Sequence, residues 1–171
     1  KPENLGGGRS SSLVLTTPDK RFIIKTIPAA EQTLLPLILN GYTQHLQDHP
    51  DSLLSRICGM YTIKYSAGPF KGHKISFITM YNVLHNPLNL PMHHIYDLKG
   101  STVGRSTLQW QDGHSKEDTE QKTLKDMDLR RQLRVGSLRK ALLTQLTADV
   151  RYLARLGIMD YSLVVGIHDC D

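Results

Sequence analysis

The chain of 171 residues has 39% hydrophobic and 22% charged side chains, which is typical of a globular domain and excludes a disordered or fibrous protein. No apolar run reaches the ~18 residues of a membrane-spanning helix, and Cys58 and Cys170 stand in no metal or disulfide spacing. The net charge is +5, and residues 99–155 are the most basic stretch. We therefore expect a reducing compartment and an anionic partner, which is a lipid surface, a phosphorylated molecule or nucleic acid.

The first part of the chain predicts a β-hairpin followed by helices. Residues 13–16 and 21–27 have the apolar content of strands and are separated by turn residues. Pro28 is expected to begin a helix, because proline is tolerated at the first helical position. Pro36 is expected to kink or split this helix, with a further helix over residues 37–47.

The middle of the chain predicts more β-structure. Residues 57–66 and 74–84 read as an antiparallel pair around a loop at residues 67–72, which contains two glycines and a proline. Residues 93–98 are again strand-like. Residues 109–123 are polar without periodicity, so we expect a surface insertion there.

The last part predicts one helix and one strand. Leucines recur at helical spacing over residues 138–156, with Ser137 as the expected N-cap and Gly157 where the helix stops. Residues 162–168 form an apolar run and are expected to be a buried strand. The elements together predict an α+β fold, an antiparallel sheet with packed helices.

The order of polar features is that of a kinase site. A glycine-rich turn at residues 6–12 precedes a strand with Lys25 near its end and a helix carrying Glu31. Each feature has a plainer interpretation: a loop, an edge lysine that extends to solvent, and an acid favoured at a helix N-terminus. Glu31 either pairs with Lys25 or only stabilises the helix start. The histidines, including His168, have no metal-ligand spacing and are expected to be structural.

Two longer motifs are more specific. Residues 97–105 read D-L-K-G-S-T-V-G-R, which places an acid, two bases, hydroxyls and glycines after a strand, as phosphate binding requires. Residues 158–168 read I-M-D-Y-S-L-V-V-G-I-H. Both motifs resemble signatures of the phosphatidylinositol phosphate kinases, and residues 123–129, T-L-K-D-M-D-L, are similar to those of plant-like members.

The resemblance implies a two-lobed lipid-kinase fold, with residues 1–90 mainly in the N-lobe and residues 91–171 beginning the C-lobe. It implies transfer of the γ-phosphate of ATP, with Mg²⁺, to phosphatidylinositol 4-phosphate, which gives the 4,5-bisphosphate. It assigns Asp160 and Lys99 to catalysis, and Lys99 and Arg105 to substrate binding. The residues it assigns to the nucleotide are Gly6, Gly7, Gly8, Ser10, Ser11, Lys25, Met80, Asn82 and Val83.

The family also has a downstream metal-binding motif and an activation loop that these residues lack. We therefore expect a piece of a longer kinase that is inactive alone and holds no metal ligands. We expect it at the inner face of the plasma membrane, as a peripheral protein able to form a homodimer. The alternatives are a phosphatidylinositol-5-phosphate 4-kinase, a non-catalytic phosphoinositide-binding scaffold and a nucleic-acid binder. Residues 99–155 lack the interleaved aromatic residues of a nucleic-acid site, so we expect no nucleic-acid partner.

Overall fold

The computed structural model describes residues 12–69, 71–107, 110–111, 114–115 and 123–170. The expected phosphate loop, from Gly6 to Ser12, lies outside these residues apart from its last member. The chain divides into two compact units, residues 1–82 with 136–158 and residues 83–135 with 159–171, and each is described by itself. The units do not coincide with the expected lobes, because residues 136–158 join the first unit. The lobe boundary near residue 90 stays a prediction.

The first unit contains a four-stranded antiparallel sheet in the order β1-β2-β4-β3. Its strands are β1 (Val14–Thr16), β2 (Phe22–Thr26), β3 (Ile57–Lys64) and β4 (Lys74–Tyr81). Both predicted antiparallel pairs are present, and β2 joins them by pairing with β4. The α+β class predicted from the sequence is confirmed.

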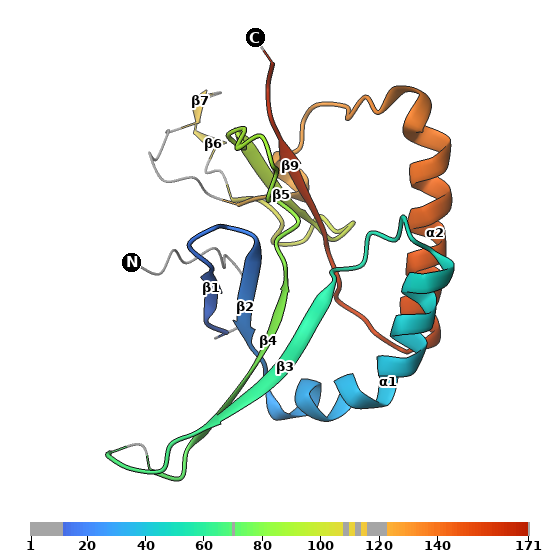
Figure 1. The fold of residues 1–171 in the computed structure, drawn as a ribbon. Helices are drawn as coiled ribbons and strands as arrows, with labels where there is room; N and C mark the ends of the chain where they lie inside the picture. Colours follow the sequence, from blue (N-terminus) through green and yellow to red (C-terminus); the bar gives the residue numbers. More distant parts are fainter. Residues whose placement is uncertain (1–11, 70, 108–109, 112–113, 116–122, 171) are drawn as a thin grey trace. The chain divides into compact units, whose positions relative to one another are not determined.

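One helix, α1 (Ala29–Asp48), follows β2 (Figure 1). The expectation that Pro36 separates two helices is wrong, because Pro36 lies inside the continuous helix. A proline removes one N–H, so one backbone hydrogen bond is missing while the turns on both sides keep theirs. Figure 1 shows the helix changing direction between its lighter blue beginning and its teal end.

The second helix, α2 (Arg139–Arg155), is preceded by a 3₁₀ turn, η2 (Gly136–Leu138). Ser137 lies inside this turn, so its predicted role as N-cap is wrong. The expected stop is confirmed, since Gly157 has φ +67°. Its N–H donates to the carbonyl of Ala154 at 3.0 Å, and the N–H of Ile158 donates to that of Leu153 at 3.1 Å, which is the Schellman arrangement.

The second unit contains a three-stranded sheet in the order β8-β5-β9. The central strand β5 (His94–Leu98) is parallel to β8 (Leu124–Lys125) and antiparallel to β9 (Leu163–Ile167). A 3₁₀ turn, η1 (Asp126–Asp128), follows β8 directly. The sequence analysis did not predict β8, because two residues are too few for a strand pattern.

Part of the expected surface insertion forms a second small sheet. It consists of β6 (Trp110–Gln111) and β7 (His114–Ser115), which pair antiparallel. Neither helix of the described part combines the length and the apolar content that crossing a bilayer requires.

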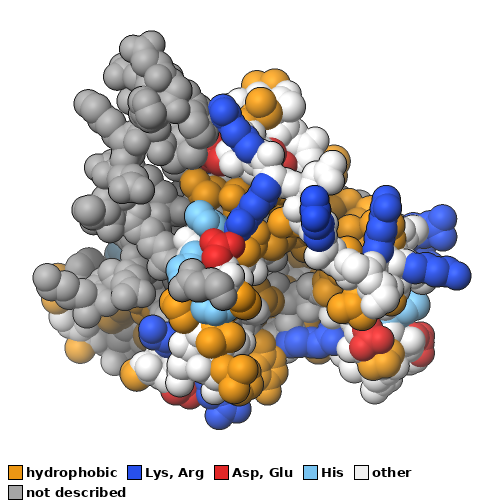
Figure 2. All heavy atoms as spheres, turned by 90° about the horizontal axis from the view of Figure 1, so that it is seen from above, with side chains coloured by type: hydrophobic (Ala, Val, Ile, Leu, Met, Phe, Trp, Pro, Cys, Tyr) orange, Lys and Arg blue, Asp and Glu red, His pale blue; other side chains and the backbone are white. Residues whose placement is uncertain are grey.

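Few apolar side chains are buried in this chain. In the described part these are Ile27, Ile78, Ile95, Tyr96 and Tyr152. The strand expected over residues 162–168 is present as β9, but its expected burial is wrong, since Leu163 and Val164 are 36% and 42% exposed. Among the residues that the structure describes, β9 pairs with β5 alone, so it has the environment of an edge strand. Figure 2 shows apolar side chains (orange) reaching the surface between basic ones.

Candidate active site

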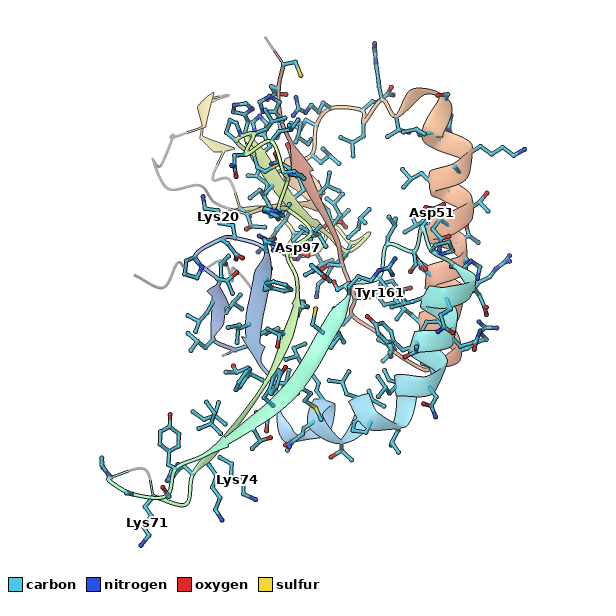
Figure 3. The ribbon with its side chains drawn as sticks, viewed as in Figure 1. Lys20, Asp51, Lys71, Lys74, Asp97 and Tyr161 are labelled. Atoms are coloured by element: carbon cyan, nitrogen blue, oxygen red, sulfur yellow. The ribbon has the colours of Figure 1, made fainter. Side chains whose placement is uncertain are left out.

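Three strand ends of the second unit meet at one edge of the β8-β5-β9 sheet. Because β5 and β9 are antiparallel with Leu98 opposite Leu163, the residues after β5 lie beside those before β9. Because β8 runs parallel to β5 with Lys125 beside Asp97, the residues after β8 reach the same edge. The register therefore gathers the two motifs, which are far apart in the sequence. Asp97 and Tyr161 mark them in Figure 3.

Lys99 and Asp160, the two predicted catalytic residues, form an ion pair at this edge. The Lys99 Nζ lies 2.7 Å from Asp160 Oδ1. Asp160 has φ +63°, in the left-handed region that few residues other than glycine adopt. Its side chain is 85% exposed and that of Lys99 is 29% exposed. The pair therefore presents a carboxylate and an ammonium together to solvent.

Lys99 lowers the pKa of Asp160. The hydrogen bond from Lys99 and its positive charge hold the pKa of Asp160 below its ordinary value. Asp160 is ionised at neutral pH, as an aspartate of ordinary pKa also is, and it can accept hydrogen bonds. Such a carboxylate can orient a hydroxyl group by accepting its hydrogen bond, and the ammonium beside it can bind a phosphate oxygen.

Asp126, in the turn after β8, fixes the backbone on which Lys99 stands. Its Oδ1 accepts the N–H groups of Lys99 at 2.9 Å and Gly100 at 2.7 Å. Both N–H groups thus reach one oxygen, and the chain continues from Gly100 with φ +70°, a left-handed backbone that glycine adopts without strain. The other oxygen, Oδ2, accepts from Arg105 Nε at 2.6 Å. One carboxylate thus holds both ends of the loop from Lys99 to Arg105.

Asp126 is ionised under all ordinary conditions. Its burial raises the pKa, but the hydrogen bonds from Arg105 and from the backbone N–H groups of Gly100 and Lys99 outweigh the burial. The pKa is held at about 2. The side chain is 14% exposed, so these bonds are formed largely out of water. The Asp126 carboxylate that holds the Lys99 backbone therefore carries a negative charge at neutral pH.

Arg105, predicted to bind substrate, is placed between two carboxylates. Besides its bond to Asp126, its Nη2 donates to the backbone carbonyl of Asp97 and lies 3.3 Å from the Asp97 carboxylate. These contacts raise the pKa of Arg105, chiefly through Asp126, and its side chain is 12% exposed. In this structure Arg105 closes the loop, and its substrate role stays a prediction.

Asp128 supports the next part of the same loop. It is 6% exposed and accepts from Ser106 Oγ at 2.9 Å, from the N–H of Thr107 at 3.0 Å and from the N–H of Lys125 at 2.9 Å. The sequence analysis singled out neither Asp126 nor Asp128. The sequence offers one signal for these two residues, the D-x-D spacing at residues 126–128. The first and third residues of this turn accept hydrogen bonds from neighbouring segments of the loop.

The predicted nucleotide residues that the structure describes are Lys25, Met80, Asn82 and Val83, which lie in the four-stranded sheet or directly after β4. Lys25 lies on β2 opposite Val14 and Ile78. Among the described residues no ion pair joins it to Glu31, which lies in the first turn of α1, where its charge favours the helix. The Lys25 assignment rests on its strand position.

The remaining predicted nucleotide residues lie at or after the end of β4. Met80 lies on β4, and Asn82 follows this strand. Asn82 donates from Nδ2 to the carbonyl of Lys20 at 2.8 Å and from its N–H to that of Arg21 at 2.9 Å. Asn82 therefore ties the β4 end to the β1-β2 turn. Val83 comes next in the chain and is 56% exposed. The adenine role of these residues stays a prediction.

No group of three or more possible metal-ligating side chains occurs in the part of the chain that is described. The described residues therefore offer no group of this size for Mg²⁺. His168 forms a hydrogen bond, as expected, since its Nδ1 donates to the carbonyl of Pro91 at 2.9 Å. His94 and Arg131 both pair with Asp169, at 3.1 and 2.9 Å.

Comparison with known proteins identifies the relatives of this chain. The family model described as phosphatidylinositol-4-phosphate 5-kinase matches residues 3–171. A phosphatidylinositol 4-phosphate 5-kinase of Schizosaccharomyces pombe is 42% identical over 95% of this chain and 21% of its own length. A probable phosphatidylinositol phosphate kinase of Dictyostelium discoideum is 39% identical over 94% of this chain and 21% of its own length.

The human phosphatidylinositol 4-phosphate 5-kinase type-1 beta is 36% identical over 96% of this chain and 29% of its own length. The chain thus spans between a fifth and a third of these three relatives. The family match, in contrast, includes almost every residue of the chain and both motifs that meet at the sheet edge. The chain belongs to the phosphatidylinositol-4-phosphate 5-kinase family.

Proposed function

We propose that the protein containing this chain transfers the γ-phosphate of ATP to phosphatidylinositol 4-phosphate and so produces phosphatidylinositol 4,5-bisphosphate. The observation that carries the proposal is the Lys99–Asp160 pair, which is exposed to solvent and rests on a loop fixed by Asp126. Family membership supports the same reaction, since relatives from fungi, plants and human bear the name phosphatidylinositol 4-phosphate 5-kinase.

The two residues divide the work of the transfer. Asp160 accepts a hydrogen bond from the inositol hydroxyl and orients its oxygen toward the γ-phosphorus. The new O–P bond forms as the bond to the β,γ-bridging oxygen breaks, and ADP leaves with that electron pair. The hydroxyl proton passes to Asp160 and then to solvent. Lys99 stabilises the charge on the transferring phosphoryl group.

The nucleotide is assigned to the first unit and the residues after β4. Lys25 contacts the nucleotide phosphates, and the backbone from Met80 to Val83 holds adenine. Gly6, Gly7, Gly8, Ser10 and Ser11, which lie outside the described residues, are assigned to the phosphates as well. Mg²⁺ accompanies ATP and is held by residues outside the described part. Arg105 contributes to phosphate placement by fixing the loop that carries Lys99.

The proposed location in the cell follows from the substrate, which is a membrane lipid. We place the protein peripherally at the inner face of the plasma membrane, with a two-lobed kinase architecture that this chain begins, and with a homodimer as its assembly. No nucleic-acid partner is included.

The test is transfer of labelled phosphate by the full-length protein to phosphatidylinositol 4-phosphate and to phosphatidylinositol 5-phosphate in parallel. Asp160→Asn and Lys99→Met are expected to lower the rate by about 10²-fold or more, because each removes a group that acts on the transferring phosphate. Asp51→Asn and Lys20→Met are the matched controls, since both side chains are exposed and lie in the other unit.

Each outcome decides between the proposals. Transfer to the 4-phosphate lipid that the first two variants lose and the controls keep supports the proposed reaction. Faster transfer to the 5-phosphate lipid supports a 4-kinase instead. Binding of either lipid without transfer by the unchanged protein supports the scaffold and contradicts the kinase.

A further inference from the structure

The hairpin formed by β3 and β4 ends in a basic tip. Its lysines are Lys64 at the end of β3, Lys71 in the connecting loop and Lys74 at the start of β4. All three are exposed. The sequence contains no aspartate or glutamate from residue 52 to residue 96, so no carboxylate of the hairpin compensates these charges. We call Lys64, Lys71 and Lys74 the hairpin tip.

The register of the hairpin brings like charges together. Lys64 lies directly opposite Lys74 in the antiparallel ladder. Like charges at directly opposed positions repel and destabilise the pair of strands. Figure 3 shows Lys71 and Lys74 at the outer end of the hairpin, with their side chains directed away from the strands. An anionic surface at this end would relieve the repulsion.

The opposite face of the same hairpin is apolar. Ile63 lies opposite Ile75, and Tyr61 lies opposite Phe77, on the face that alternates with Lys64 and Lys74. These side chains are open to solvent in the first unit, where Tyr61 is 53%, Ile63 49% and Ile75 41% exposed. The hairpin end therefore combines lysines with exposed isoleucine and tyrosine side chains.

We propose that the hairpin tip is a contact site for an anionic membrane surface. Lysines near such a surface attract acidic lipid headgroups, while tyrosine and isoleucine suit the boundary between headgroups and acyl chains. A nucleic acid would use the charge but not the branched apolar pair. The inference rests on the proposed function, because that function places the substrate lipid in a membrane.

The test is co-sedimentation of the full-length protein with vesicles of phosphatidylcholine containing about 20 mol% phosphatidylserine. The triple variant Lys64→Gln, Lys71→Gln, Lys74→Gln is expected to bind these vesicles roughly 100-fold more weakly, since each lysine near the surface contributes about fivefold. Binding of the unchanged protein is expected to fall with added salt, which screens the charges. Ile63→Ser alone, with all lysines kept, is expected to weaken binding several-fold.

The matched control removes three positive charges from α2 in the same unit. Arg139→Gln, Lys140→Gln, Arg151→Gln changes exposed residues and the net charge equally. This control is expected to retain most of the binding. Equal loss in both triple variants would overturn the proposal, because net charge would then explain the binding. Unchanged binding of the hairpin variant would overturn it too.

A second assay separates this inference from the proposed function. Phosphate transfer to detergent-solubilised phosphatidylinositol 4-phosphate needs no membrane surface, so the hairpin variant is expected to keep its rate there while losing transfer on vesicles. Loss in both assays would contradict a membrane-contact role and indicate a role in folding or catalysis. Absence of transfer by the unchanged protein would contradict the kinase proposal and leave the vesicle-binding result to be judged by itself.

Discussion

Two aspartates of this chain, one in each unit, use their carboxylates in opposite ways. Asp149 on α2 is 2% exposed. It accepts hydrogen bonds from His45 Nε2, Ser52 Oγ and the N–H of Leu53, each at 2.7 Å. The side chain of Asp160 is 85% exposed and pairs with Lys99. Buried charge with many donors ties elements together, whereas exposed charge with one cationic partner is available to a substrate.

The comparison shows that the role of an aspartate is inferred from its burial and its partners. Asp149 joins α1, the loop after it and α2, and His45 also stacks on Tyr152 with ring centroids 4.4 Å apart. Its pKa is lowered because hydrogen bonds, from His45 first, outweigh the effect of burial. Asp160 also has a lowered pKa, through Lys99. A lowered pKa alone therefore does not distinguish the structural carboxylate from the proposed catalytic one.

The largest expected effect on stability is that of Asp149→Ala. We expect a loss of about 3 kcal/mol, because the change leaves several buried donors without an acceptor. Urea denaturation of the full-length protein followed by circular dichroism measures this loss. Asp48→Ala, on the exposed end of α1, is the control and is expected to change stability by less than about 0.5 kcal/mol. A loss below about 1 kcal/mol for Asp149→Ala would contradict the proposed role.

The second effect is a pH dependence that Asp126 contributes. Its pKa is about 2 in the folded chain against an ordinary 3.8, so its ionised form is stabilised by about 2 kcal/mol. Because the folded pKa is the lower one, this stabilisation is complete above about pH 4. It is lost as the pH falls from about 4 to about 2. Unfolding measured over this range should show a flatter acid limb in Asp126→Asn than in the unchanged protein.

Asp126→Asn is also expected to lower the activity. Asp126 contacts only the loop, so we expect it to act by positioning Lys99. The variant is expected to lower kcat by about tenfold or more with little change in KM for ATP, since a misplaced cation affects the transferring phosphate. Asp128→Asn tests the neighbouring carboxylate and should lower kcat less. Equal kcat in Asp126→Asn and the unchanged protein would refute positioning.

A smaller effect is expected for Gly100→Ala. Gly100 has φ +70° and open space around its Cβ position, so the cost is backbone strain of about 1 kcal/mol. Gly136→Ala, with φ +55° and the same open space, is the matched control. Both should lower stability similarly, but only Gly100→Ala should lower transfer, because only Gly100 lies in the loop that carries Lys99, where a strained backbone would shift the Lys99 ammonium. Similar transfer rates in the two variants would show that the Gly100 geometry is irrelevant to catalysis.

The smallest expected effect on stability is that of Lys99→Met. The carboxylate of the Lys99–Asp160 pair is exposed, and ion pairs open to water contribute little to stability. The midpoint of thermal unfolding, measured by scanning calorimetry, should therefore remain close to that of the unchanged protein. A large drop would mean that the pair is structural and would remove the contrast with Asp149.

The sequence predicted much of the fold because its signals are local. Apolar runs between turn residues located β1 to β5, and leucine spacing with Gly157 located α2 and its end. The helix over Pro36 was divided wrongly, because one missing hydrogen bond does not end a helix that otherwise continues. The β9 strand was judged buried because an apolar run does not reveal how many neighbours a strand has.

The candidate site was predicted only in part for a similar reason. The motifs around Lys99 and Asp160 are contiguous, and their resemblance to a family located both residues. Asp126 acts across 26 and 27 residues of sequence on Gly100 and Lys99, through a parallel strand of only two residues. The D-x-D spacing at residues 126–128 is visible in the sequence, but no local pattern identifies Lys99 and Gly100 as the partners of Asp126. The left-handed backbone of Asp160 is likewise a property of the loop in three dimensions.

The most direct test of the central claim is the phosphate-transfer rate per folded molecule of full-length Asp160→Asn beside full-length Asp149→Asn, on phosphatidylinositol 4-phosphate. We predict that Asp160→Asn folds normally and loses about 10²-fold or more of the rate, whereas Asp149→Asn loses stability but keeps the rate of its folded fraction. A folded Asp160→Asn variant with an unchanged rate would contradict the account.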